Sequence, residues 1–213
     1  MAHEEIIASE QSHEPVAAWW ERNHVEGSQS WLTGSTSDTV WTRLGLADKL
    51  GPDHVVLNIG VGLGADTRAL AERVKEVHVL DIAPSALARV QDVTKGGYLA
   101  SDLDALPTAK FDYALSHLVA QHMDDEALLA QMRAVFRALK PGGVFAVQSA
   151  CVTSAFDRRE DALHMKGGGV LRTEAMVETM VKATGGSVVA SFVSDELPHD
   201  VYFFTTHAMP AAS

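Results

Sequence analysis

The sequence predicts an α/β fold built on a doubly wound, mostly parallel sheet. Short apolar runs that suit buried strands alternate along the chain with segments of helical periodicity. A glycine-rich turn joins the first strand to the helix after it, an arrangement that lets a ligand lie against the backbone. Two apolar runs close the chain with a short polar connection, so they pair antiparallel. Strands that alternate with helices require crossover connections, which place helices on both faces of a parallel sheet.

The length and composition favour a single globular domain. The chain has 213 residues, 46% hydrophobic and 21% charged, and no apolar run approaches the roughly 18 residues of a membrane span. Residues 1–50 are expected to form an N-terminal helical cover, and residues 51–213 the main body. The acidic start, residues 1–5, lacks the basic-then-apolar order of a signal peptide. We therefore expect a cytoplasmic protein with no membrane partner.

Charge and cysteine content exclude further classes. Lys and Arg number 17 against 28 Asp and Glu, which gives a formal net charge of −11. Such a surface repels phosphate backbones, so we expect no nucleic-acid partner. The single cysteine, Cys151, cannot form an internal disulfide or a multi-cysteine zinc site. We interpret it as a small apolar residue at a strand end rather than as a nucleophile.

The N-terminal region reads as two helices with a polar loop between them. Residues 14–25 predict a helix, residues 26–37 a polar loop that suits a lid, and residues 38–50 a second helix. The first helix carries Trp19 and Trp20. These two side chains either complete the core or contact a substrate, and we favour the core.

The main body contains seven strand patterns and four helical ones. The strands are predicted at residues 55–59, 77–81, 98–100, 111–116, 144–148, 188–193 and 201–206. The helices are predicted at residues 65–75, from residue 86, at 124–139 and at 173–184. The helix at 124–139 has the clearest apolar stripe, an acidic start and a Pro-Gly-Gly end. Residues 151–172 lack any clear period, and so long a loop is usually functional.

Three glycines follow the first strand at a spacing of two: Gly60, Gly62 and Gly64. Backbone N–H groups at the following helix start would face a bound ligand, which favours a polar or anionic group and indicates a nucleotide-like cofactor. Ending the motif at Ala65 satisfies the dinucleotide fingerprint, with Asp81 near the place of a ribose-binding acid. The glycines alone do not decide which cofactor is bound.

The spacing Gly60-x-Gly62-x-Gly64 also resembles motif I of the class I S-adenosylmethionine-dependent methyltransferases. Residues 139–143, Leu-Lys-Pro-Gly-Gly, match that family's signature before its fifth strand, and the terminal hairpin is similar to its characteristic ending. The resemblance covers about residues 50–208. It implies a Rossmann-like seven-stranded sheet in the order 3-2-1-4-5-7-6, with strand 7 antiparallel.

The resemblance also implies S-adenosyl-L-methionine as the cofactor and a set of residues that bind it. Asp81 matches the acid that bonds the ribose hydroxyls, and Asp102 matches the acid at the adenine amino group. Asn58 stands where the family usually has an acid that helps to hold the methionine end, so we expect lower affinity. The implied cofactor residues are Asn58, Gly60, Gly62, Gly64, Asp81, Ile82, Asp102, Leu103 and His117.

His122 is the candidate catalytic residue. It lies just after the fourth predicted strand, at the exit that borders the transferred methyl in this fold, and imidazole titrates near neutrality. His122 would act as a general base or orient the substrate. The alternative is that it merely starts the following helix. His117, in the same segment, is expected to line the cofactor pocket.

No metal site is expected. The metal-dependent catechol-type methyltransferases carry an Asp-Asn pair after the fifth strand, where this chain has Ser-Ala-Cys at residues 149–151. His24, His164 and His199 are expected to be solvent-exposed.

The sequence thus predicts a methyltransferase acting on a hydroxyl or amine of a small molecule. Residues 14–50 and 151–172 would cover that methyl acceptor, and the oligomeric state, monomer or homodimer, is left open. Because Asn58 replaces an acid, a non-catalytic module that only binds the cofactor is an alternative. A nicotinamide-dependent oxidoreductase is less favoured, because no tyrosine is followed four residues later by lysine.

Overall fold

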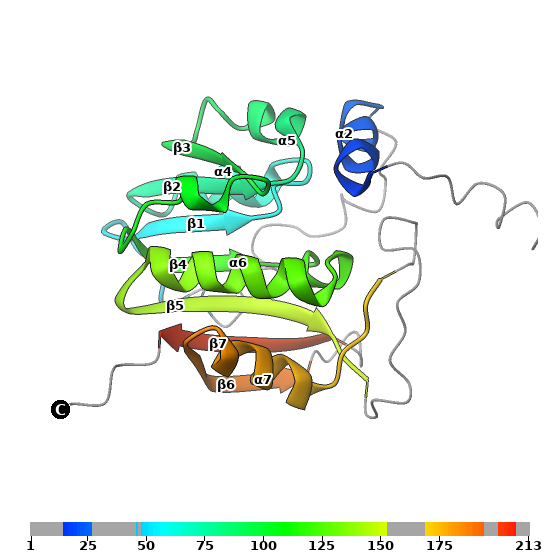
Figure 1. The fold of residues 1–213 in the computed structure, drawn as a ribbon. Coiled ribbons are helices and arrows are strands. Elements are labelled where there is room, and N and C mark those ends of the chain that lie inside the picture. Colours follow the sequence, from blue (N-terminus) through cyan, green and yellow to red (C-terminus); the bar gives the residue numbers. More distant parts are fainter. Residues whose placement is uncertain (1–14, 27–45, 47, 153–168, 194–199, 208–213) are drawn as a thin grey trace, which may run out of the picture.

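The computed structural model describes residues 15–26, 46, 48–152, 169–193 and 200–207. Its centre is a seven-stranded sheet in the order β3-β2-β1-β4-β5-β7-β6 (Figure 1). The strands are β1 (Val55–Ile59), β2 (Glu76–Asp81), β3 (Gly96–Leu99), β4 (Phe111–Ser116), β5 (Leu139–Ala150), β6 (Gly186–Val193) and β7 (Asp200–His207). β7 runs antiparallel to β5 and β6, and the other neighbours are parallel. The predicted fold class, strand order and antiparallel seventh strand are confirmed.

Helices cover both faces of the sheet. They are α2 (Val16–Glu26), α4 (Ala65–Ala71), α5 (Pro84–Arg89), α6 (Asp125–Ala138) and α7 (Glu174–Ala183), with short 3₁₀ turns η1 (Leu103–Ala105) and η2 (Ala120–His122). Figure 1 shows α6 and α7 on one face of the sheet, and α2 beyond the strand ends near α5. Among the described helices, none combines the length and the apolar character needed to cross a bilayer.

The core has two layers because successive side chains of a buried strand point to opposite faces. Val55, Leu57 and Ile59 of β1 pack in the cluster that includes the buried stripes of α6 and α7. Val56 packs in the other cluster, with Leu70 of α4. Every residue of β1 is buried, and the alternation places Asn58 on the α4 side.

Several predicted boundaries were wrong by a few residues. α4 ends at Ala71, not at 75, because the Arg73 and Val74 amides both donate to the Leu70 carbonyl in a tight turn before β2. β5 begins at Leu139, so the Lys-Pro-Gly-Gly segment is the irregular start of the strand rather than a linker. The predicted loop 26–37, helix 38–50 and loop 151–172 lie largely outside the described residues.

The amino ends of the strands are joined by ion pairs. The Asp112 carboxylate on β4 accepts from Lys140 Nζ of β5 at 2.8 Å and from the Val55 amide of β1 at 2.8 Å. Glu76 of β2 pairs with Lys110 at 2.8 Å. Although burial opposes it, the Lys140 ammonium and the Val55 amide lower the pKa of Asp112. These contacts hold β1, β4 and β5 together at their amino ends, which lie opposite to the glycine turn.

Candidate active site

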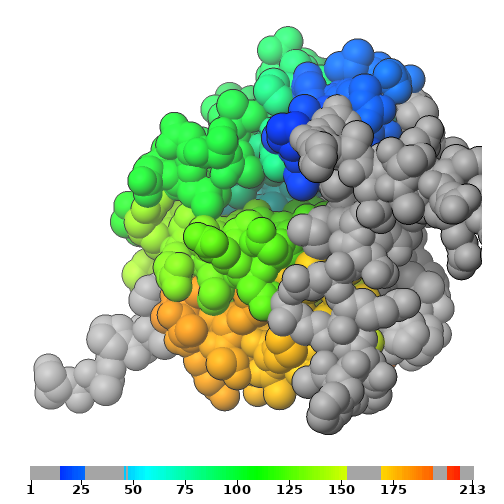
Figure 2. Space-filling view, turned by 45° about the vertical axis from the view of Figure 1, so that its right-hand side comes forward, coloured from blue at the N-terminus to red at the C-terminus, as the bar shows by residue number. Residues whose placement is uncertain are grey.

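A pocket lies at the carboxyl ends of β1, β2 and β4, where ligands bind in open α/β sheets. Its free space, counted out to the open mouth, is about 1060 Å³. The walls come from the glycine turn, the ends of β1 and β2, the β4 exit and helix α2. Figure 2 shows α2, in blue, beside blue-green atoms of the body, and hydrogen bonds join α2 to α5 (Pro84–Arg89). The pocket is thus closed on one side by a helix that precedes the sheet in sequence.

The glycine turn has the backbone that the sequence predicts. Gly60 and Gly62 have positive φ values of 79° and 55°, a conformation that other residues adopt at a cost. A Cβ on Gly60 would overlap a methyl group of Val119 at the β4 exit, whereas a Cβ on Gly62 would meet only open space. Gly60 therefore allows two segments to pack closely, and Gly62 leaves the backbone open to the pocket.

Asp81, the last residue of β2, holds this turn in place through hydrogen bonds. Its carboxylate accepts from the Val61 amide at 2.6 Å and from the Ala83 amide at 2.9 Å. Burial raises the pKa of Asp81, although the two amides and nearby His24 oppose that shift. The side chain is only 6% exposed and lines the pocket, so it presents a fixed acceptor to a ligand hydroxyl.

Asn58 does not line the pocket. Its amide nitrogen donates to the Thr67 hydroxyl at 2.9 Å, and both side chains are buried between β1 and α4. This hydrogen bond fixes the helix on the strand. The position that usually carries an acid in the family is thus occupied here by a structural contact.

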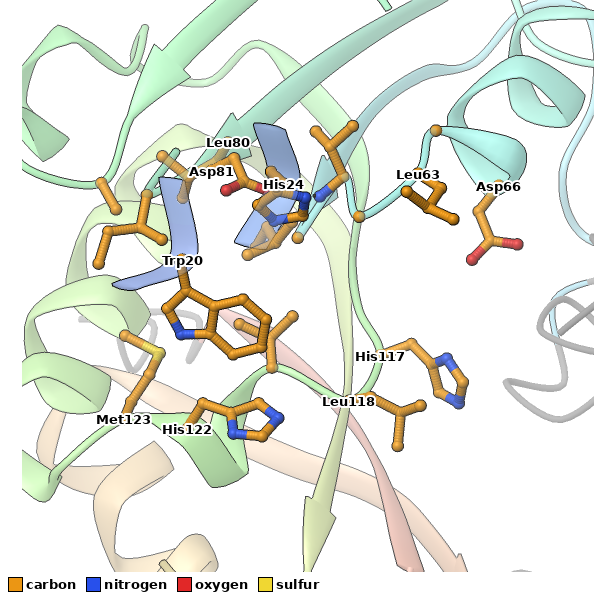
Figure 3. Close-up of a pocket in the computed structure, with 18 of the residues that line it drawn as sticks. Trp20, His24, Leu63, Asp66, Leu80, Asp81, His117, Leu118, His122 and Met123 are labelled. Carbon is orange, nitrogen blue, oxygen red and sulfur yellow. Dashed lines mark hydrogen bonds between the residues drawn. The ribbon is translucent and has the colours of Figure 1, made fainter. Parts of the chain in front are cut away.

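Helix α2 carries three pocket residues, Val16, Trp20 and His24, of which the last two are labelled in Figure 3. Two contacts hold the helix on α5: Glu21 accepts from the Ser85 amide and hydroxyl, and Arg89 donates to the His24 carbonyl at 2.8 Å. His24 is buried, so the expectation that it is solvent-exposed was wrong. Burial lowers the pKa of His24 while Asp81 opposes the shift, and its Nδ1 has no hydrogen-bond partner among the described residues.

The β4 exit brings His117 and His122 to the same pocket. Between them Leu118 has a φ of 57°, a strained value for leucine, and its amide donates to Gln148 Oε1 at 2.9 Å. The ring of His122 lies edge to face with Trp20, with 5.1 Å between centroids (Figure 3). The predicted catalytic residue therefore faces the helix that closes the pocket.

A buried arginine fixes the backbone around His122. Arg172 is fully buried; it donates to the Ala120 carbonyl at 3.0 Å and to the Met123 carbonyl at 2.7 Å, and pairs with Asp125 at 2.9 Å. Those carbonyls flank His122 on both sides. A residue fifty positions away in sequence thus holds the η2 turn in place.

Asp66, on the first turn of α4, is a pocket residue that sequence analysis missed. No donor among the described residues reaches its buried Oδ1. Burial without a compensating cation raises the pKa of Asp66 to about 6. An acid in the first helical turn usually interacts with the helix dipole, so the pattern gave no sign of a site.

The structure brings most of the predicted site residues together. Those that line the pocket are Gly60, Gly62, Gly64, Asp81, Ile82, His117 and His122. Asn58, Asp102 and Leu103 do not line it; Asp102 is exposed and Leu103 packs against the core. Within the described ranges, no group of three or more His, Cys, Asp or Glu side chains is arranged to hold a metal ion.

The residues present fit a nucleoside cofactor with a polar tail. A rigid buried carboxylate at the end of β2 suits ribose hydroxyls, and the open backbone at Gly62 leaves room beside it. Asp66 and His24 add polar atoms whose hydrogen-bonding capacity is unused among the described residues.

Comparisons with known proteins agree with this geometry. Residues 56–143 match a family described as methyltransferase domain. The chain is 33% identical over 108 residues to malonyl-[acyl-carrier protein] O-methyltransferase of Salmonella typhimurium, which covers 49% of this chain and 42% of that protein. It is 32% identical over 107 residues to 2-methyl-6-phytyl-1,4-hydroquinone methyltransferase of Synechocystis sp., covering 47% and 33% respectively. The match spans less than half the length of either relative.

Among solved structures, 1,6-didemethyltoxoflavin-N1-methyltransferase of Burkholderia thailandensis, with bound 1,6-didemethyltoxoflavin and S-adenosylhomocysteine, superposes with a TM-score of 0.61. The alignment covers 90% of this chain and 84% of that one at 20% identity, which establishes the shared fold. Residues 56–143 thus match a methyltransferase domain, and the sheet order and glycine turn around them are similar to those of the class I S-adenosylmethionine-dependent methyltransferases.

Proposed function

We propose that the chain binds S-adenosylmethionine at the carboxyl edge of the sheet and transfers its methyl group to a hydroxyl or amine of a small molecule. The observation that carries this proposal is the buried Asp81 carboxylate, held against the glycine turn by the Val61 and Ala83 amides. That arrangement presents a fixed acceptor for ribose hydroxyls, as the family resemblance requires. Ile82 lies beside it in the pocket wall.

When bound, the cofactor supplies an electrophilic methyl on a sulfonium. The protein then has to align the acceptor in line with that methyl and exclude water. Trp20 and Met123 give the His122 side of the pocket an apolar lining, which favours a small acceptor with an apolar body. Helix α2 acts as a cover over this part of the pocket in this scheme.

His122 is proposed to take the proton from a hydroxyl acceptor. A neutral imidazole can accept a proton on a ring nitrogen, which is the chemistry that a hydroxyl acceptor requires. The Trp20 ring contact and the Arg172 hydrogen bonds to the neighbouring carbonyls fix its position. An unprotonated amine acceptor needs no base, and His122 would then only orient the substrate.

The relatives act on different acceptors by their names: a malonyl group on acyl-carrier protein, a phytyl hydroquinone and a toxoflavin precursor. What they share is methyl transfer, which supports the reaction class. Their diversity leaves the acceptor of this chain to experiment.

A non-catalytic cofactor-binding module is the second candidate, favoured by one observation. Asn58 is committed to Thr67 and does not line the pocket, so the usual acid has no counterpart at that position. A nicotinamide-dependent oxidoreductase has no comparable support in the structure.

Methyl transfer can be tested by incubating the full chain with methyl-labelled S-adenosylmethionine and a low-molecular-weight extract, followed by mass spectrometry. A new labelled product, formed more slowly by Asp81→Asn at limiting cofactor, would support the proposal and identify the acceptor. Cofactor binding without any labelled product, across extracts that contain hydroxyl and amine acceptors, would favour the binding module.

A further inference from the structure

Asp66 is a carboxylate that lines the pocket, and no cationic side chain among the described residues forms an ion pair with it. Its Oδ1 is buried, and no donor among the described residues reaches it. Burying a charged oxygen in this way costs free energy unless a partner arrives. Burial raises the pKa of Asp66 to about 6. The group is therefore arranged to take a donor or a cation from a ligand.

The position of Asp66 indicates which end of the cofactor it would meet. Figure 3 shows Asp66 beside Leu63, on the opposite side of the pocket from Asp81. The turn of residues 60–64 joins the strand end beside Asp81 to the helix that carries Asp66, so a ligand with its ribose at Asp81 can extend along this turn toward Asp66. Asp66 thus lies at the end of the pocket where the methionine portion would extend.

Asn58, which stands where the family usually has an acid, contacts the helix turn that carries Asp66. Strand alternation directs the Asn58 side chain toward α4, where it bonds Thr67, the residue next to Asp66. An acid at position 58 would point to this same helix turn. Asp66 therefore supplies a negative charge next to Thr67, the residue that Asn58 contacts. Unlike Asn58, Asp66 lines the pocket.

We propose that Asp66 replaces the missing acid at position 58 and binds the α-ammonium group of S-adenosylmethionine. This inference rests on the proposed cofactor. The interaction is a charge-assisted hydrogen bond between an ammonium donor and a desolvated carboxylate. It removes the electrostatic reason to expect weak cofactor binding from Asn58.

Calorimetry with S-adenosylhomocysteine, which has the same α-ammonium, tests the assignment. The second ligand is 5′-S-(3-carboxypropyl)-5′-thioadenosine, which lacks only the amino group. Asp66→Asn should weaken S-adenosylhomocysteine binding by roughly 10- to 50-fold and change binding of the deaminated ligand by less than about threefold. Asp53→Asn, an exposed aspartate before β1 at the opposite edge, is the matched control and should change neither affinity.

The pattern of losses distinguishes the possible results. Equal effects of Asp66→Asn on the two ligands, or no effect on either, would overturn the ammonium assignment while leaving cofactor binding intact. If the wild-type chain binds neither ligand, the proposed function fails together with the inference. Asp66→Ala gives a second measurement of the same difference, and melting curves for each variant check that it is folded.

Discussion

The carboxylates at the amino ends of the parallel strands differ in their partners from those at the carboxyl ends; these two ends are called the two edges below. At the amino ends of the strands, Glu76 and Asp112 are each paired with a lysine at 2.8 Å. At the carboxyl ends, Asp81 is held by backbone amides and Asp66 has a buried oxygen without a partner among the described residues. Side-chain partners lower the pKa values of the first pair, and burial raises those of the second.

We interpret the lysine-paired carboxylates as stabilising the sheet, and those at the carboxyl ends as part of the proposed site. Paired carboxylates fix the register of β1, β4 and β5 and have no unused charge to offer. At the carboxyl ends, Asp66 Oδ1 has no donor among the described residues, and we propose that a ligand supplies one. Perturbed pKa values that cluster in a cleft are typical of functional sites. The predictions below test whether the two edges respond differently to mutation.

The largest effect is expected from His122→Ala. If the acceptor is a hydroxyl, loss of the base should lower kcat by about 10²- to 10⁴-fold with nearly unchanged cofactor affinity. Steady-state kinetics with the identified acceptor, with and without added imidazole, would measure it. Wild-type kcat and KM in this variant would reduce His122 to a residue of the η2 turn.

Asp81→Asn should weaken S-adenosylhomocysteine binding by about 1–3 kcal/mol, because the amide replaces one charged acceptor at the ribose hydroxyls. Calorimetry measures the loss directly. The variant also perturbs the Val61 amide contact, so a 2′-deoxyribose ligand serves as the control. That ligand should show a smaller loss, and an equal loss would contradict a direct contact with the ribose.

Asp112→Asn should destabilise the fold by about 1–2 kcal/mol through the lost Lys140 pair, and leave cofactor affinity unchanged. The folded-state pKa of Asp112 is depressed, so its contribution is present above its unfolded pKa, near 4, and is lost as pH falls through the lower folded value. Urea denaturation of both proteins at pH 7 measures the difference. A changed cofactor affinity would contradict the division between the two edges.

Asp66→Asn should have the smallest effect on stability, and the opposite sign. Because folding raises its pKa to about 6, ionised Asp66 opposes folding above that pH, and this cost disappears as pH falls toward 4. The variant should be more stable than wild type by about 1 kcal/mol at pH 7.5, below the full shift because the side chain is partly open to solvent. Melting curves at pH 7.5 and pH 4.5 should differ only at the higher value. A variant that is less stable at pH 7.5 would show that Asp66 has a stabilising partner.

The local features of the site could be predicted from sequence, and the assembled ones could not. Gly60, Gly62 and Asp81 act through turns and strand ends that nearby residues encode. His24 enters the pocket because contacts distant in sequence, such as that of Glu21 with Ser85, 64 residues away, hold α2 on α5. No local pattern carries that information.

The role of Asn58 likewise could not be predicted from the sequence. Motif matching directed attention to Asn58, but its role depends on which face of β1 its side chain occupies. Burial on both faces removes the apolar–polar alternation that would reveal this. Arg172, in a segment without periodicity, likewise shows its contact to the His122 turn only in three dimensions.

Hydrogen–deuterium exchange of the full chain, with and without saturating S-adenosylhomocysteine, tests the division between the two edges most directly. The account predicts added protection in peptides that contain the glycine turn, residues 81–83, the β4 exit and α2, because ligand binding suppresses local opening there. Peptides of the opposite edge, around Val55, Asp112 and residues 139–143, should exchange at the same relative rate in both states. Protection confined to that opposite edge, or no protection anywhere, would contradict a cofactor site at the carboxyl ends of the strands.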